Sequence, residues 1–178
     1  MSHQFSVPTR EEVAPANQTI FDNLKKGLGF VPNLYAAIAY SDTALGTYLQ
    51  LQNAPSSISK KEREIVNLVV SQVNGCDYCL SAHTVLGKMN GLTNEQVIEI
   101  RKGSSSINAK TDALVKITQD IALNRGHISP ASLDAFFAAG YTQANLVDIL
   151  ITVADKVVMN YLHNITNVPI DFPLAPAL

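Results

Sequence analysis

The dipeptide Asn74-Gly75 separates two segments of helical period, and it constrains the fold more than any other feature of the chain. Upstream, Ser59 stands where a helix cap is needed, with Glu62 three residues later as its capping-box partner. Downstream, a second apolar segment begins near Cys76 and ends at Gly91. Because Asn-Gly is a strong turn signal, the pattern predicts two helices folded back on each other.

Helical spacing of apolar residues recurs along the rest of the chain, and no segment shows convincing strand-like alternation. The expected helices cover residues 17–28, 34–52, a short stretch opened by the cap Thr93 with Gln96, and residues 110–124, 129–139 and 142–164. The fold class predicted from this pattern is all-α, a helical bundle.

The chain length of 178 residues fits a single domain, 1–178. Residues 1–16 are polar and read as an N-terminal arm, while residues 17–103 form a first half that carries the cysteines. A Ser-rich linker, 103–108, leads to a second half and a proline-containing tail, 109–178.

A similarity between two segments of the chain, called the echo below, suggests that one helical unit has been duplicated. Ile65–Ser71 and Leu146–Thr152 match in character position by position. The same register sets Cys79 against Asn160 and His83 against Asn164. We therefore expect a degenerate second copy, with the chemistry kept in the first.

Composition excludes several classes of function. The net charge is −2 and the basic residues are scattered, so neither nucleic acid nor a membrane surface is an expected partner. No signal peptide is visible in the first twelve residues, and no apolar run approaches the roughly 18 residues of a membrane helix. With only two cysteines, in a C-x-x-C motif, a cytoplasmic location is expected. The mean hydropathy of +0.10 is high for a soluble domain and indicates that another subunit covers part of the surface.

Both cysteines and one histidine share a narrow face of the second helix. At about 100° per residue, Cys79 lies about 60° and His83 about 20° from Cys76. Cys79 and His83 are four residues apart, the spacing at which helical side chains meet. Free amide groups and the dipole of the first helical turn favour a thiolate there and lower the pKa of cysteine.

Glu64 joins these residues if the two helices are antiparallel. It then lies level with residue 85, within about one helical turn of His83. A carboxylate beside an imidazole orients the ring and raises its basicity. Glu64, His83 and Cys79 would form a nucleophile, base and orienter, as expected for an activated thiol.

Two simpler readings remain open. The C-x-x-C motif could be ordinary core packing. Alternatively, Cys76, Cys79 and His83 could hold a structural zinc with Glu64 as the fourth ligand, although no second C-x-x-C or histidine pair is present. No nucleotide-binding motif occurs, and we predict neither a cofactor nor a metal site.

The segment from Lys61 to Thr84 resembles the signature of the carboxymuconolactone decarboxylase/alkylhydroperoxidase D-like superfamily. The pattern that this segment shares with the signature is a glutamate (Glu64), a cysteine twelve residues later (Cys76), a second cysteine three residues later (Cys79) and a histidine four residues after that (His83). Gly29-Phe-Val-Pro-Asn-Leu34 is similar to the lead-in of the peroxidase-related branch. The resemblance extends over about residues 20–172 and is strong over 59–92.

The resemblance implies an internally duplicated all-helical fold, assembled as a homo-oligomer (a dimer, trimer or hexamer), with antioxidant hydroperoxide reductase activity. Cys79 would attack the peroxide and Cys76 would resolve the sulfenic acid to a disulfide, while His83 and Glu64 relay the proton. An external dithiol reductant, a thioredoxin-like or lipoyl protein, would restore the thiols.

Tyr78 departs from the family pattern, because alkylhydroperoxidase D proper has a histidine between its cysteines. We assign Tyr78 a supporting place beside the site. Two alternative functions are a redox-switched oligomeric binding protein and a carboxymuconolactone decarboxylase-like enzyme. The decarboxylase branch generally lacks the cysteine pair, which argues against the second of these.

Overall fold

The computed structural model describes residues 5–178, which contain helices and loops but no β-strand. The prediction of an all-α fold is confirmed. The elements are η1 (Arg10–Glu12), α1 (Pro15–Leu28), α2 (Asn33–Ile38), α3 (Ala44–Gln52), α4 (Lys60–Val73), α5 (Asp77–Met89), α6 (Asn94–Arg101), α7 (Ala109–Asn124), α8 (Pro130–Ala138) and α9 (Gln143–Thr166). The expected arm, 1–16, lies partly outside the described residues; within it, η1 forms and α1 begins at Pro15.

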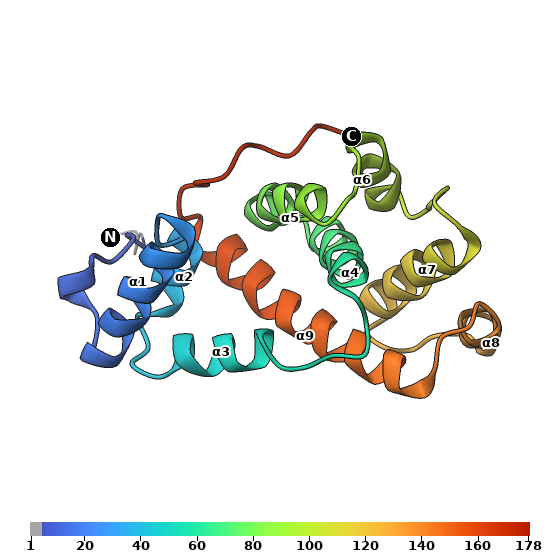
Figure 1. Ribbon diagram of the computed structural model, residues 1–178, viewed down its shortest axis with the longest axis horizontal. Helices are drawn as coiled ribbons and strands as arrows, with labels where there is room; N and C mark the ends of the chain where they lie inside the picture. The colour runs from blue at the N-terminus through green and yellow to red at the C-terminus, as the bar shows by residue number, and fades with distance from the viewer. Residues whose placement is uncertain (1–4) are drawn as a thin grey trace.

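Helix α4 is the centre of the bundle and packs against α5, α7 and α9. Its apolar residues are buried on nearly all sides, which explains why the segment shows a continuous hydrophobic run. Helix α9 crosses the molecule diagonally, between α1–α3 on one side and α4–α8 on the other (Figure 1). The main core lies between α4, α6, α7, α8 and α9, while the cysteines belong to a second apolar cluster that includes residues of α2, α3 and α9.

The predicted helix over residues 34–52 is wrong: the chain forms α2 and α3 instead. The side chain of Asn17, in α1, donates hydrogen bonds to the carbonyl oxygens of Ala39 (3.1 Å) and Ser41 (3.0 Å). Ser41 Oγ in turn accepts from the amide of Ala44, at the start of α3. These contacts satisfy backbone groups that a continuous helix would have paired internally, so the chain can bend between α2 and α3.

The internal duplication stays a prediction, but the hairpin turn has no counterpart in the second half. In the register of the echo, Asn74 and Gly75 correspond to Asp155 and Lys156, and α9 runs through both positions without a break. The second segment therefore continues as one helix where the first turns back.

The C-terminal tail after α9 runs extended over the top of the bundle toward α6 (Figure 1). Asn33 and Arg101 donate hydrogen bonds to the carbonyl oxygens of Pro169 and Pro176, and Ser81 Oγ accepts from the amide of Ala175. Among the described helices, none has by itself the length and apolar composition of a membrane span. Helices α8 and α9 meet that test only as a pair, bent by 116°.

Candidate active site

The turn between α4 and α5 places the cysteines. Gly75 adopts φ +62°, its amide donates to Gln72 O, and the amide of Cys76 donates to Ser71 O at 3.0 Å. This is the Schellman arrangement for ending a helix, and its left-handed position favours glycine. Cys76 is also the N-cap of α5, because its Sγ accepts from the amide of Cys79 at 3.3 Å. One residue thus ends α4 and begins α5, leaving both cysteines at a helix start.

The two thiols differ in environment. Both are buried, and Cys79 lines a large apolar cavity whose described wall does not include Cys76. The neighbouring Cys76 thiol and the positive charge of Lys156 lower the pKa of Cys79, although burial opposes them. Interaction with Cys79, together with burial, raises the pKa of Cys76. Cys79 is accordingly the thiol that ionises more readily, and Cys76 is the thiol that holds its proton more strongly.

Glu64 and His83 meet as the antiparallel arrangement of α4 and α5 predicts. Glu64 Oε2 lies 2.7 Å from His83 Nδ1, and both side chains are buried. Asn67, one turn after Glu64, donates to Glu64 Oε1 at 3.4 Å. Burial raises the pKa of the Glu64 carboxyl, but the hydrogen bond from His83, the positive charge of Lys156 and the hydrogen bond from Asn67 oppose it, and the net shift is downward. The carboxylate therefore holds a proton on Nδ1 of the ring.

Lys156 occupies the other side of the imidazole, and sequence reasoning missed it. Its Nζ lies 3.0 Å from His83 Nε2, and the side chain is almost completely buried. Burial and the Lys156 charge lower the pKa of His83, so the ring is neutral and Nε2 accepts from the ammonium. Burial alone would lower the pKa of Lys156, but the surrounding anionic groups, Asp155 first among them, raise it.

The expected direct pairing of Cys79 with His83 is replaced by this arrangement: across residues 5–178, no hydrogen bond joins the two side chains. A signal for Lys156 was present in the sequence, since Asp155-Lys156 is a charged pair inside an apolar helical segment. A charge in such a segment is buried only if it is partnered.

Asn160, which corresponds to Cys79 in the register of the echo, contacts the turn between α4 and α5. Its Oδ1 accepts from Asn74 Nδ2 at 3.0 Å, and its Nδ2 donates to Ser71 Oγ at 3.2 Å. Asn160 also lowers the pKa of both cysteines, as a smaller contribution than their mutual interaction. Helix α9 thus supplies both a cation and an amide to a site whose thiols come from α5.

Tyr78 supports the tail rather than the thiols. Its hydroxyl donates to Asp171 Oδ1 at 2.7 Å and accepts from the amide of Leu34 at 3.2 Å. Burial and the Asp171 hydrogen bond raise the pKa of Tyr78, so the phenol stays protonated. Asp171 also accepts from the amide of Asn33, the first residue of α2. The ring packs against Phe172, 5.6 Å between centroids.

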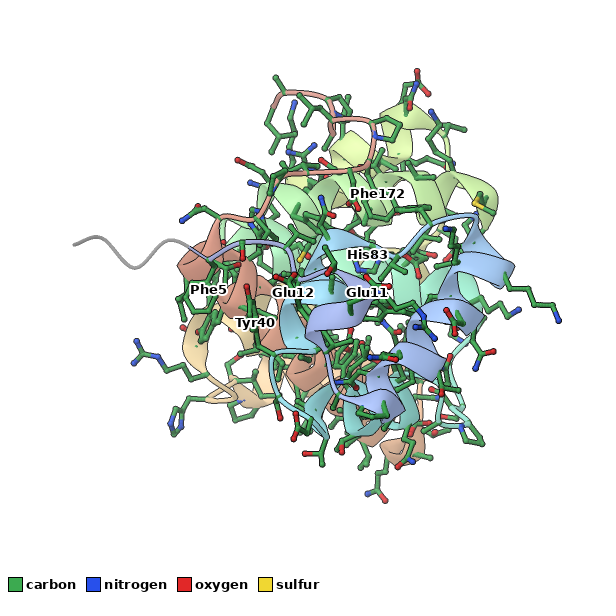
Figure 2. All side chains as sticks on the ribbon, turned by 90° about the vertical axis from the view of Figure 1, so that its left-hand side faces the viewer. Phe5, Glu11, Glu12, Tyr40, His83 and Phe172 are labelled. Carbon is green, nitrogen blue, oxygen red and sulfur yellow. The ribbon has the colours of Figure 1, made fainter. Side chains whose placement is uncertain are left out.

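A cavity of about 450 Å³ opens beside Cys79, His83 and Lys156. Most of its remaining wall is apolar, formed by Leu28, Phe30, Pro32, Leu34, Tyr35, Tyr48, Ala82, Val85, Leu86, Met89, Met159 and Phe172, together with Gly27, Gln52 and Tyr78. In the view of Figure 2, Phe172 of the tail lies above His83. A second cavity, of about 240 Å³, reaches His83 and Glu64 past Lys60, Arg63 and Asp155. The site thus has an apolar side that includes Cys79 and a polar side that does not.

The zinc reading receives no support from the arrangement of ligands. Among residues 5–178, no group of three or more histidine, cysteine or carboxylate side chains is placed to hold a metal. The ammonium of Lys156 also stands at His83 Nε2, where a cation would have to bind. Positive charge at that nitrogen opposes metal ligation.

Comparison with known proteins points to one family. Residues 39–120 match the carboxymuconolactone decarboxylase family. Alkyl hydroperoxide reductase AhpD of Mycobacteroides abscessus is 32% identical over 92 residues, which are 52% of this chain and 49% of that protein. The chain thus spans about half the length of this curated relative.

Solved structures share the fold over nearly the whole chain. An uncharacterized peroxidase-related protein from Ralstonia eutropha JMP134, described as an AhpD core, superposes with a TM-score of 0.82 at 18% identity, covering 91% of this chain and 88% of that one. The debrominase Bmp8 superposes with a TM-score of 0.78 at 18% identity, covering 96% and 94%. At these identities the likeness establishes the fold alone.

Proposed function

Because residues 39–120 match the carboxymuconolactone decarboxylase family, we propose that the chain belongs to this family and is a thiol-dependent hydroperoxide reductase that cycles between a dithiol and a Cys76–Cys79 disulfide. The observation that carries the proposal is the position of Cys79. It is the cysteine with the lowered pKa, and it lines an apolar cavity beside the buried Glu64–His83 pair. The relatives named AhpD support the same class of reaction.

The first step is attack by the Cys79 thiolate on the terminal oxygen of a hydroperoxide, ROOH. The S–O bond forms, the O–O bond breaks, and the electron pair leaves with RO⁻, which takes up a proton to give ROH. Cys79 is then a sulfenic acid. The Cys76 thiol displaces its hydroxyl group, forming the disulfide and releasing water. Two electrons have passed from the cysteines to the peroxide.

The buried Glu64–His83 pair is proposed to relay protons during the cycle. Its hydrogen bond fixes the tautomer of the ring and leaves Nε2 directed toward Lys156. The second cavity supports this role, since its wall includes both Glu64 and His83 but neither cysteine. Removal of a relay member typically slows such a step about 10²–10⁴-fold.

Mass spectrometry after treatment with one equivalent of tert-butyl hydroperoxide tests the cycle. The parent protein should lose two free thiols and two hydrogen atoms of mass. Cys76→Ser should still consume peroxide and gain one oxygen atom at Cys79, because attack remains and resolution is lost. Cys79→Ser should do neither.

Persistent thiols in the parent, or equal reactivity of Cys79→Ser, would show that the assignment is wrong. A brominated pyrrole run in parallel would separate peroxide reduction from the chemistry named for the debrominase of similar fold.

The cycle requires an external dithiol, for which a thioredoxin-like or lipoyl protein is the proposed source. A homo-oligomeric assembly is also proposed. It is supported by exposed apolar side chains that recur along α9: Val147, Leu150, Ile151, Val158, Tyr161 and Ile165. A cytoplasmic, antioxidant role completes the proposal.

The alternative of a redox-switched binding protein predicts a different outcome from the same samples. Turnover would be slow with every dithiol donor, while light scattering would show that oxidation changes the assembly state. The decarboxylase alternative predicts full activity on a lactone substrate after both cysteines are changed to serine.

A further inference from the structure

A buried cation without an assigned role lies at the centre of the site. Lys156 is 2% exposed, and it is the only lysine or arginine among the residues that line the apolar cavity. Tyr78, between the two cysteines, is uncharged and hydrogen-bonded to Asp171. His83 is neutral, because burial and the Lys156 charge lower its pKa. Positive charge at this end of the cavity therefore comes from Lys156.

The groups around Lys156 account for its position. Nζ donates to His83 Nε2 at 3.0 Å and lies 3.8 Å from Asp155 Oδ2. Cys79, Tyr35 and Glu64 are the other titratable groups whose charges act on it. Asp155 does not line the apolar cavity, whereas Cys79 does. Burying an ammonium is costly unless it is partnered. Its carboxylate partner is Asp155, while two of its other neighbours, His83 and Cys79, belong to the proposed reaction.

We propose that Lys156 is a catalytic residue of this site, which pairs with the Cys79 thiolate and donates the proton that the leaving alkoxide requires. This inference rests on the proposed function and adds to it the identity of the acid. Glu64 and His83, proposed above as the relay, act in this step as positioning residues: His83 holds the lysine through Nε2, and Glu64 fixes the ring tautomer.

The cycle closes without an additional proton. The Cys79 thiolate and Lys156 ammonium react with ROOH to give the sulfenic acid, ROH and a neutral amine. Cys76 then forms the disulfide and releases water. An external dithiol reduces the disulfide to two thiols, and Cys79 returns its proton to Lys156. The balance is ROOH plus dithiol giving ROH, water and an oxidised donor.

Two substitutions separate the two roles of Lys156. Lys156→Met removes both the charge and the proton. Lys156→Arg keeps a charge, but a guanidinium does not give up its proton in proteins. Lys88→Met, at an exposed position of α5, is the matched control. Circular dichroism and thermal unfolding establish that each variant is folded.

Two readouts are compared: alkylation of Cys79 by iodoacetamide across pH, performed in the Cys76→Ser background, and single-turnover reduction of tert-butyl hydroperoxide. We expect Lys156→Met to move the alkylation profile to higher pH and to slow peroxide reduction by about 10²-fold or more. Lys156→Arg should keep alkylation near the parent profile yet slow peroxide reduction. A loss of packing alone would not slow peroxide reduction while leaving the alkylation profile unchanged.

Full peroxide reduction by Lys156→Arg would overturn the assignment of the proton donor. An unchanged alkylation profile in Lys156→Met would overturn the pairing with the thiolate. If the parent reduces no peroxide, the proposed function fails, but the alkylation profiles still decide whether Lys156 stabilises the thiolate. If Lys156→Met does not fold, the parent and Lys156→Arg still decide the proton transfer.

Discussion

His83 is held at both ring nitrogens, by a carboxylate at Nδ1 and an ammonium at Nε2. Burial and the ammonium keep the imidazole neutral in the folded protein, although the carboxylate by itself favours protonation of the ring. The same ammonium also lowers the pKa of Cys79, but there the lowering favours the charged form, because the ionised thiol is an anion. One buried lysine therefore acts on the ionisation of two neighbouring groups in the direction that the proposed chemistry needs.

Stability should depend on pH through His83. Its folded pKa lies below the ordinary value of about 6.5, so the unfolded chain binds a proton first. The stability that the neutral His83 contributes is fully present above the ordinary pKa and is lost as the pH falls through the lower pKa of the folded state. Urea unfolding of the parent should lose up to about 1.4 kcal/mol per pH unit in this window.

His83→Gln should be less stable than the parent near neutral pH, with a flatter pH profile, because it cannot take up the proton. His127→Gln is the control at an exposed loop position, and its profile should run parallel to the parent. Parallel profiles for the parent and His83→Gln would contradict the neutral, buried imidazole.

At the scale of elements, the α4–α5 hairpin depends on Gly75. Its left-handed conformation ends α4 and lets Cys76 cap α5. Ser59 and Glu62 form the predicted capping box at the other end of α4, and Thr93 and Gln96 form the one predicted for α6. These capping boxes could be predicted from the sequence because each depends on residues only three positions apart in the chain.

Gly75→Ala should destabilise the protein by about 1–2 kcal/mol, the usual cost of placing a side chain in the left-handed region. No heavy atom lies within 4 Å of the added Cβ, so the cost is conformational. Gly27→Ala in α1 is a suitable control: its Cβ also meets open space, without positive φ, and should stabilise the helix by up to about 1 kcal/mol. Equal unfolding free energies for the two variants would refute this explanation.

At the scale of the whole molecule, the reactive side chains and the tail come from three parts of the chain, and residues between positions 27 and 52 complete the cavity wall. The α4–α5 hairpin brings Glu64, His83 and the thiols, α9 brings Lys156, and the tail brings Phe172 to the cavity wall. Asp171 joins the tail to Tyr78 and to the start of α2. The tail is therefore part of the enclosure of the cavity.

Asp171→Ala should leave the Tyr78 hydroxyl and the Asn33 amide without their acceptor. We expect a loss of about 1–3 kcal/mol in unfolding free energy. Limited proteolysis should cut the tail faster than in the parent. Asp134→Ala, at an exposed position of α8, is the control and should leave both measurements unchanged. A tail that is equally resistant in Asp171→Ala would show that other contacts hold it.

By itself, the sequence determined the helical class, the hairpin turn and the meeting of Glu64 with His83. Each of these depends on the helical period and on one turn, which are short-range properties. Tertiary structure decided the break between α2 and α3, where Asn17 from another helix takes up the backbone groups. It also decided the place of Lys156, which reaches His83 from a helix 73 residues further along the chain. Helical spacing cannot predict such contacts, because they depend on how whole helices pack.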